Sequence, residues 1–179
     1  IMKFIVAVLS AMFVWASATS FPNPASAAPR AQPFKGLSKE EQAVLLPVQN
    51  AIAKKDWTSA QTLLPAALAS AQSPAARYAV GRFQFETGIG ANDVRMQAEG
   101  LDNLLASGQV PAADLPTIYR NQGVLAKNGG DKVKAEAAFA RLAELTPSDP
   151  EALITLAQIK SDLKKPQEAV QLISRAIEM

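Results

Sequence analysis

Cysteine and histidine are absent from the whole 179-residue chain. No disulfide, thiol nucleophile or imidazole base can form, a Cys/His zinc site is excluded, and this chain alone cannot build a Ser-His-Asp triad. Aromatic residues make up only 6% of the sequence, and alternating runs of β-branched residues are missing, which disfavours a β-rich fold. Eighteen basic residues nearly balance sixteen acidic ones, so the net charge of +2 gives no electrostatic footprint for nucleic acid.

The N-terminal residues have the pattern of a secretory signal. Lys3 supplies a positive charge, residues 4–18 form a nearly continuous apolar run, and Ala-Ser-Ala at 25–27 is a small-residue cleavage triplet. The apolar run is shorter than the ~20 residues that a membrane-spanning helix needs. We therefore predict a signal peptide at 1–27, cleaved after Ala27, and a secreted or periplasmic protein. An inner-membrane-anchored form with an uncleaved signal is the alternative.

A proline-containing linker at 28–36 is expected to precede a helical domain at 37–179. Ser38 and Glu41 form the capping box of a first helix, and Pro74 suits the first position of a third. Asn92 is expected to cap the fourth helix. The predicted helices cover about 39–54, 57–71, 74–90, 93–107, 113–128, 132–146, 150–163 and 166–179. Eight helices with short connections predict four αα-hairpins.

Small and large apolar residues recur at a step of 34 residues in the C-terminal half, as in helix-turn-helix solenoids. These repeat-packing residues are Tyr119, Gly123, Ala135, Phe139, Pro147, Leu153, Ala157, Ala169 and Ile173. The small members would let two helices approach closely. Phe139 and Ile173, one step apart, are expected to fill the wedge between neighbouring repeats.

On these residues the chain resembles the tetratricopeptide repeat family over about 41–179. The resemblance implies an all-α, right-handed solenoid of about four αα-hairpins. The expected repeats are about 41–74, 75–115, 116–149 and 150–179, of which the second is stretched. Pro47 and Pro65 depart from the family pattern and are expected to kink the helices of the first repeat.

In this family the first helix of each pair lines a concave groove, so the resemblance also implies which side chains meet a partner. The groove positions carried over by repeat phase are Gln49, Phe83, Arg120, Asn121, Val124, Lys127, Thr155 and Gln158. Arg120 and Asn121 stand where some family members clamp a terminal carboxylate, although Ala79, Val80 and Ile154 replace the other clamp residues. Alternatively, Arg120 is a solvated helix residue, or it belongs to a mixed groove for an extended or helical segment.

Other residues have plainer interpretations. Trp57 is expected to pack at the start of the second helix, and one of Phe83 and Phe85 to lie in the core. Glu99 and Asp102 share a helix face, but no third ligand stands nearby in sequence, so no metal site is predicted.

The sequence therefore predicts a non-enzymatic interaction scaffold of the cell envelope. Its partner would be a protein or peptide, with no cofactor, metal, nucleic acid or small-molecule substrate. Contact with a membrane is expected only if the signal is retained. Two alternatives remain open: a recruiting or regulatory module of a larger envelope enzyme, and a membrane-anchored assembly factor.

Overall fold

The computed structural model describes residues 36–179. The predicted signal peptide and residues 28–35 of the predicted linker lie outside these residues and stay predictions. Every regular element in the described part is an α-helix. The helices are α1 (Lys39–Ala53), α2 (Trp57–Ser70), α3 (Pro74–Gly90), α4 (Val94–Ala106), α5 (Leu115–Asn128), α6 (Lys132–Leu145), α7 (Pro150–Asp162) and α8 (Pro166–Ile177).

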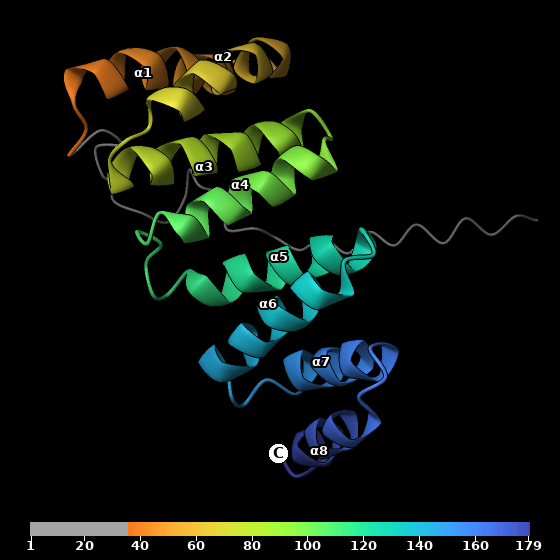
Figure 1. Ribbon diagram of the computed structural model, residues 1–179. Coiled ribbons are helices and arrows are strands. Elements are labelled where there is room, and N and C mark those ends of the chain that lie inside the picture. The colour runs from red at the N-terminus through yellow and green to blue at the C-terminus, as the bar shows by residue number, and fades with distance from the viewer. Residues whose placement is uncertain (1–35) are drawn as a thin grey trace, which may run out of the picture. The chain divides into compact units, whose positions relative to one another are not determined.

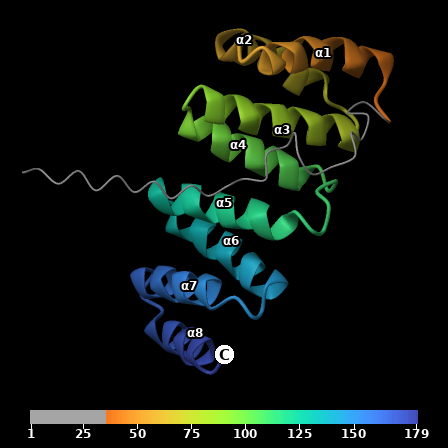
Figure 2. The same cartoon turned by 180° about the vertical axis from the view of Figure 1, so that it is seen from behind.

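The helices form four hairpins that stack in chain order (Figures 1 and 2). The most extensive contacts join the two helices of each hairpin, α1 with α2, α3 with α4, α5 with α6 and α7 with α8. Each hairpin then contacts the next through its second helix, and α1 also contacts α3. Because the described hairpins contact only their neighbours in the chain, the fold is a solenoid. The predicted all-α hairpin architecture is confirmed.

Side-chain caps set most of the helix starts. The hydroxyl of Ser38 accepts a hydrogen bond from the backbone of Glu41 at 3.1 Å, and the Glu41 carboxylate accepts one from the Ser38 backbone at 3.0 Å. The predicted capping box is therefore confirmed. The prediction for α4 is wrong, because Asp93 rather than Asn92 accepts the bond from the Met96 backbone.

Asn92 has a different task, which three other residues share. Each hairpin turn contains one residue with positive φ, and these residues are Lys55 (57°), Asn92 (56°), Gly130 (82°) and Lys164 (62°). The backbone N–H of the following residue donates to a carbonyl five residues earlier, as in Asp56 to Ala51 at 2.9 Å and Asp131 to Ala126 at 2.9 Å. This is the bond that closes a Schellman motif. The four turns thus have one geometry despite their different sequences.

The interior is divided between two hydrophobic clusters. One joins α1, α2 and α3 around Leu45, Leu64 and Phe83, and Trp57 packs against it as predicted. The other joins α5, α6 and α7 around Phe139 and Leu153.

The close approach predicted at Gly123 is confirmed. A methyl group at Gly123 would lie 2.6 Å from the Phe139 ring, so no larger residue fits without movement. Ala135, Leu153, Ala157 and Ala169 are buried, and Tyr119 is partly buried.

Two of the repeat-packing predictions fail. Pro147 is exposed, and Ile173 is 43% exposed, whereas Phe139 at the equivalent position is 2% exposed. The reason is positional, because Phe139 lies between α5 and α7, and no described helix follows α8 to cover Ile173.

The two unusual prolines do not end their helices. α1 continues through Pro47 and α2 through Pro65. Both prolines are exposed, so the carbonyl groups that lose an N–H partner face solvent rather than the core.

Candidate functional site

The register of the second hairpin decides which α3 residues can reach a partner. A methyl group at Gly81 would lie 2.7 Å from the Leu104 backbone nitrogen in α4, just as one at Gly123 would meet Phe139 in α6. Aligning these two glycines places the second repeat one residue earlier than predicted. Arg82, which is exposed, then takes the position of Val124.

The groove prediction for Phe83 is therefore wrong. Its side chain is 2% exposed and lies in the cluster with α1 and α2. A one-residue shift on a helix turns a side chain by about 100°, which is enough to exchange a surface position for a core position. Phe85, the other candidate, is half-buried.

The other predicted groove residues lie on α1, α5 and α7 with graded exposure. Val124, Lys127 and Gln158 are exposed, whereas Gln49, Arg120, Asn121 and Thr155 are half-buried. The side-chain Nδ2 of Asn121 is buried without a hydrogen-bond partner. The exposed positions on α5 and α7 also include Ile154, which is 44% exposed. These two helices thus present a mixture of aliphatic, amide and basic side chains.

Arg120 is already paired within the protein. Its guanidinium donates to the Asp149 carboxylate and lies 3.8 Å from the carboxylate of Glu151. Asp149 caps α7 by accepting from the backbone nitrogens of Glu151 at 3.0 Å and Ala152 at 3.2 Å. Arg120 therefore ties α5 to the start of α7. A guanidinium held in this way is a poor candidate for clamping a foreign carboxylate.

The charge of Asp149 is favoured by these contacts. Partial burial acts to raise the pKa of its carboxyl group, but the backbone N–H of Ala152 and the Arg120 guanidinium outweigh it. The pKa is consequently lower than usual for aspartate, and the ion pair persists throughout the neutral range.

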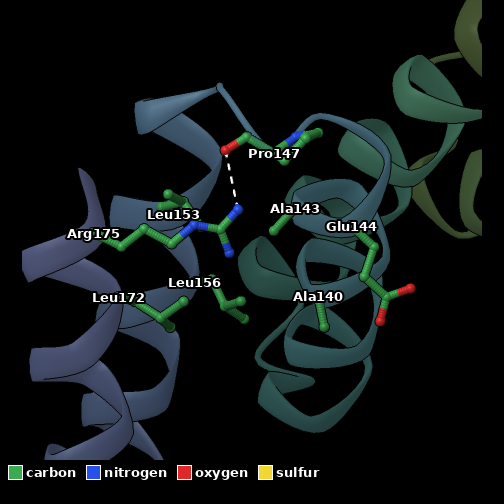
Figure 3. Close-up of a pocket in the computed structure, with 8 residues that line it drawn as sticks. All are labelled: Ala140, Ala143, Glu144, Pro147, Leu153, Leu156, Leu172 and Arg175. Carbon is green, nitrogen blue, oxygen red and sulfur yellow. Dashed lines mark hydrogen bonds between the residues drawn. The ribbon is translucent and has the colours of Figure 1, made fainter. Parts of the chain in front are cut away.

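The protein also has a hollow between α6 and α8, on which the sequence prediction was silent (Figure 3). Its volume is about 360 Å³. The residues that line it are Ala140, Ala143, Glu144, Pro147, Leu153, Leu156, Leu172 and Arg175. Figure 3 shows Arg175 extending from α8 toward Pro147, whose carbonyl accepts a hydrogen bond from it at 3.1 Å.

The chemistry of this hollow is an apolar floor with charges at its edge. Ala140 and Ala143 leave room that larger residues would fill, while Arg175 and Glu144 supply opposite charges. Glu144 pairs with Arg141, which stands one 34-residue step before Arg175. That step was the available sequence signal, but it becomes meaningful only once α6 and α8 are known to be neighbours.

The acidic residues considered for metal binding have partners of another kind. Glu99 accepts from Gln84 at 3.0 Å, and Asp102 accepts from Gln122 at 2.8 Å and from Lys134. Within residues 36–179, no three acidic side chains are grouped so that they could hold a metal ion. No helix in this part of the chain is both long enough and apolar enough to cross a membrane.

The geometry defines the protein as a helical-hairpin solenoid of tetratricopeptide-like architecture. No family model and no curated protein matches the sequence. Among solved structures, that of MamA matches with 17% identity over 82% of each chain and a TM-score of 0.48. A likeness of this size does not extend to function.

Proposed function

We propose that this protein is a non-enzymatic scaffold that binds a protein or peptide segment on the exposed face of its first helices. The observation that carries the proposal is the solenoid itself. Each described hairpin contacts only its neighbours, so α5 and α7 keep side chains such as Val124, Lys127, Ile154 and Gln158 exposed. We call these four residues the α5–α7 strip. Such arrays bind other chains by shape and side-chain chemistry along an extended surface.

The composition of the α5–α7 strip favours one kind of partner. Val124 and Ile154 are 41% and 44% exposed, and Lys127 forms no ion pair within residues 36–179. An amphipathic segment with aliphatic side chains and an acidic residue would complement them. A clamp for a terminal carboxylate is disfavoured, because Arg120 is held by Asp149.

We also propose membership of the tetratricopeptide repeat family and a place in the cell envelope. The first rests on the 34-residue recurrence and the four hairpins with a common turn geometry. The second rests on the signal-like residues 1–27. N-terminal sequencing of the protein produced in a bacterial host tests the export proposal: a start at Ala28 supports it, and a retained leader overturns it.

Differential capture from an envelope extract tests the binding proposal. The bait is compared with a Val124→Asp/Lys127→Glu variant, which makes the α5–α7 strip acidic. A Val133→Asp variant is the matched control, because Val133 is 69% exposed on α6, a second helix of a hairpin. All three proteins should have the same helical circular dichroism.

The expected result is a protein that the parent and the Val133 variant retain and the double variant loses. That protein should then bind the purified parent directly. If every captured protein is held equally by all three baits, the α5–α7 strip is not the binding surface.

A further inference from the structure

α8 has apolar residues on two opposite sides. Ala169 is buried, and Leu172 and Ala176 are partly buried against the core. On the other side, Val170, Ile173 and Ile177 are 62%, 43% and 78% exposed. Their i, i+3, i+7 spacing places them in one row along the helix. We call these three residues the outer row of α8.

The outer row continues the surface on which the hairpins stack. One 34-residue step earlier, Phe139 and Ala143 of α6 occupy the positions of Ile173 and Ile177 and are 2% and 7% exposed. They are buried in the cluster that includes Leu153 and Leu156 of α7. The outer row is therefore built like a covered face. Figures 1 and 2 show no helix beyond α8 in the described stack.

The outer row also adjoins a hollow that a helix could fill. Val170 and Ile173 line it with Ala157, Gln158 and Pro166, and its volume is about 380 Å³. Three exposed aliphatic side chains beside such a hollow are typical of an association surface rather than of scattered surface residues.

We propose that the outer row of α8 is a self-association surface, covered by the same row of a second copy of this chain in an antiparallel, two-fold pair. Such a pair needs one surface that is complementary to itself. The neighbouring positions Gln167, Gln171 and Ser174 are exposed and uncharged, so the two copies bring no like charges together there.

The opposite end of the described stack is a poorer partner for the outer row. The exposed face of α1 includes Leu46 at 42%, but Asn50 and Lys54 stand one and two helical turns further along it. A head-to-tail contact would also leave both end faces open and build filaments. The two-fold pair buries the aliphatic row on both copies at once.

Sedimentation velocity on protein produced from the full sequence tests the proposal. The parent should form a dimer as its concentration rises. Ile173→Glu should raise the dissociation constant by at least about tenfold, because the two introduced carboxylates would face each other across the axis. Leu46→Glu is the matched control, since Leu46 has the same exposure on α1, and it should dimerise like the parent.

Three outcomes would overturn the two-fold pair. The parent could stay monomeric at all concentrations, or the Ile173 variant could dimerise unchanged. In a head-to-tail contact, by contrast, both variants would lose self-association and an equal mixture of the two would form a one-to-one complex.

Cross-linking gives a second, independent readout, because the chain contains no cysteine. Under mild oxidation, Ser174→Cys should form a covalent dimer, since the same residue of two copies lies near a two-fold axis. Asn50→Cys, exposed on α1, is the control and should remain monomeric. Equal cross-linking of both variants would indicate random collision and overturn the proposed geometry.

Discussion

The carboxylate of Glu41 accepts a hydrogen bond from the backbone nitrogen of Ser73 at 2.8 Å, across the boundary between the first and second hairpins. It also accepts from the Ser73 hydroxyl and from the backbone of Gln72 and Ser38. Ser73 caps α3 and Ser38 caps α1, so one buried side chain joins the starts of two helices.

Replacing Glu41 by Gln should lower the free energy of unfolding by about 1.5–3 kcal/mol, because hydrogen bonds to a charged group are lost. Glu40→Gln is the control, since Glu40 is exposed beside it, and it should change stability by less than about 0.5 kcal/mol. Urea denaturation at neutral pH measures both. Equal losses would show that the bonds of Glu41 to Ser73 add nothing.

The contribution of Glu41 should also depend on pH. The backbone N–H of Ser73, and next that of Ser38, holds the pKa of the Glu41 carboxyl below its usual range, although burial opposes this. A lowered pKa in the folded state stabilises the protein above the unfolded pKa, which is about 4.3 for glutamate. This stabilisation is lost as the pH falls through the folded pKa.

The stability difference between the parent and Glu41→Gln should therefore be constant above about pH 5 and shrink below about pH 4. Denaturation of the two proteins at a series of pH values measures it. Using the difference removes the effects of other carboxylates, such as Asp149 and Glu136, whose pKa values are also lowered. A difference that does not change with pH would mean that Glu41 is uncharged in the folded protein.

Local features of this fold were readable from the sequence, because their causes lie within a few residues. The capping box at Ser38 and Glu41 and the start of α3 at Pro74 were predicted at the residues where they occur. Asn92 shows the limit, since Asn and Asp are both good caps. The choice fell to Asp93 once Asn92 took the left-handed position of the turn.

Features that depend on distant residues were not readable. The error at Phe83 came from a register off by one residue, which only the contact between Gly81 and Leu104 corrects. The pairing of Arg120 joins residues 29 positions apart and removes the freedom that the groove prediction assumed. The exposure of Ile173 depends on what covers α8, about which the 34-residue pattern says nothing.

Phe139→Ala should lower the free energy of unfolding by about 3–5 kcal/mol, because it removes a buried ring between α5 and α7. Gly123→Ala should cost about 1–3 kcal/mol, since its methyl group would strike that ring. In the Phe139→Ala background the same glycine substitution should cost far less. Chemical denaturation of the four proteins measures the coupling, and simple additivity would argue against the contact.

Arg120 should prove structural when its partner is changed with it. Arg120→Gln should cost about 0.5–1 kcal/mol, the usual value of a partly exposed ion pair. Asp149→Ala should cost about 1–2 kcal/mol, because it also removes the cap of α7. Arg120→Gln should then cost less in the Asp149→Ala background. Thermal unfolding measures the cycle, and an unchanged cost would leave Arg120 free to bind a partner.

Lys164 occupies a backbone conformation that costs a residue with a side chain about 1–2 kcal/mol. Lys164→Gly should therefore raise the free energy of unfolding by up to about 1 kcal/mol, since the greater freedom of glycine in the unfolded chain offsets part of the relief. Lys164→Ala is the control, because it removes the same charge but keeps the unfavourable φ, and it should give no gain. Gly130 holds the equivalent position, so Gly130→Ala should lose about what Lys164→Gly gains. If the glycine and alanine variants at 164 have the same melting temperature, the strain at this turn is not what limits the stability of the last hairpin.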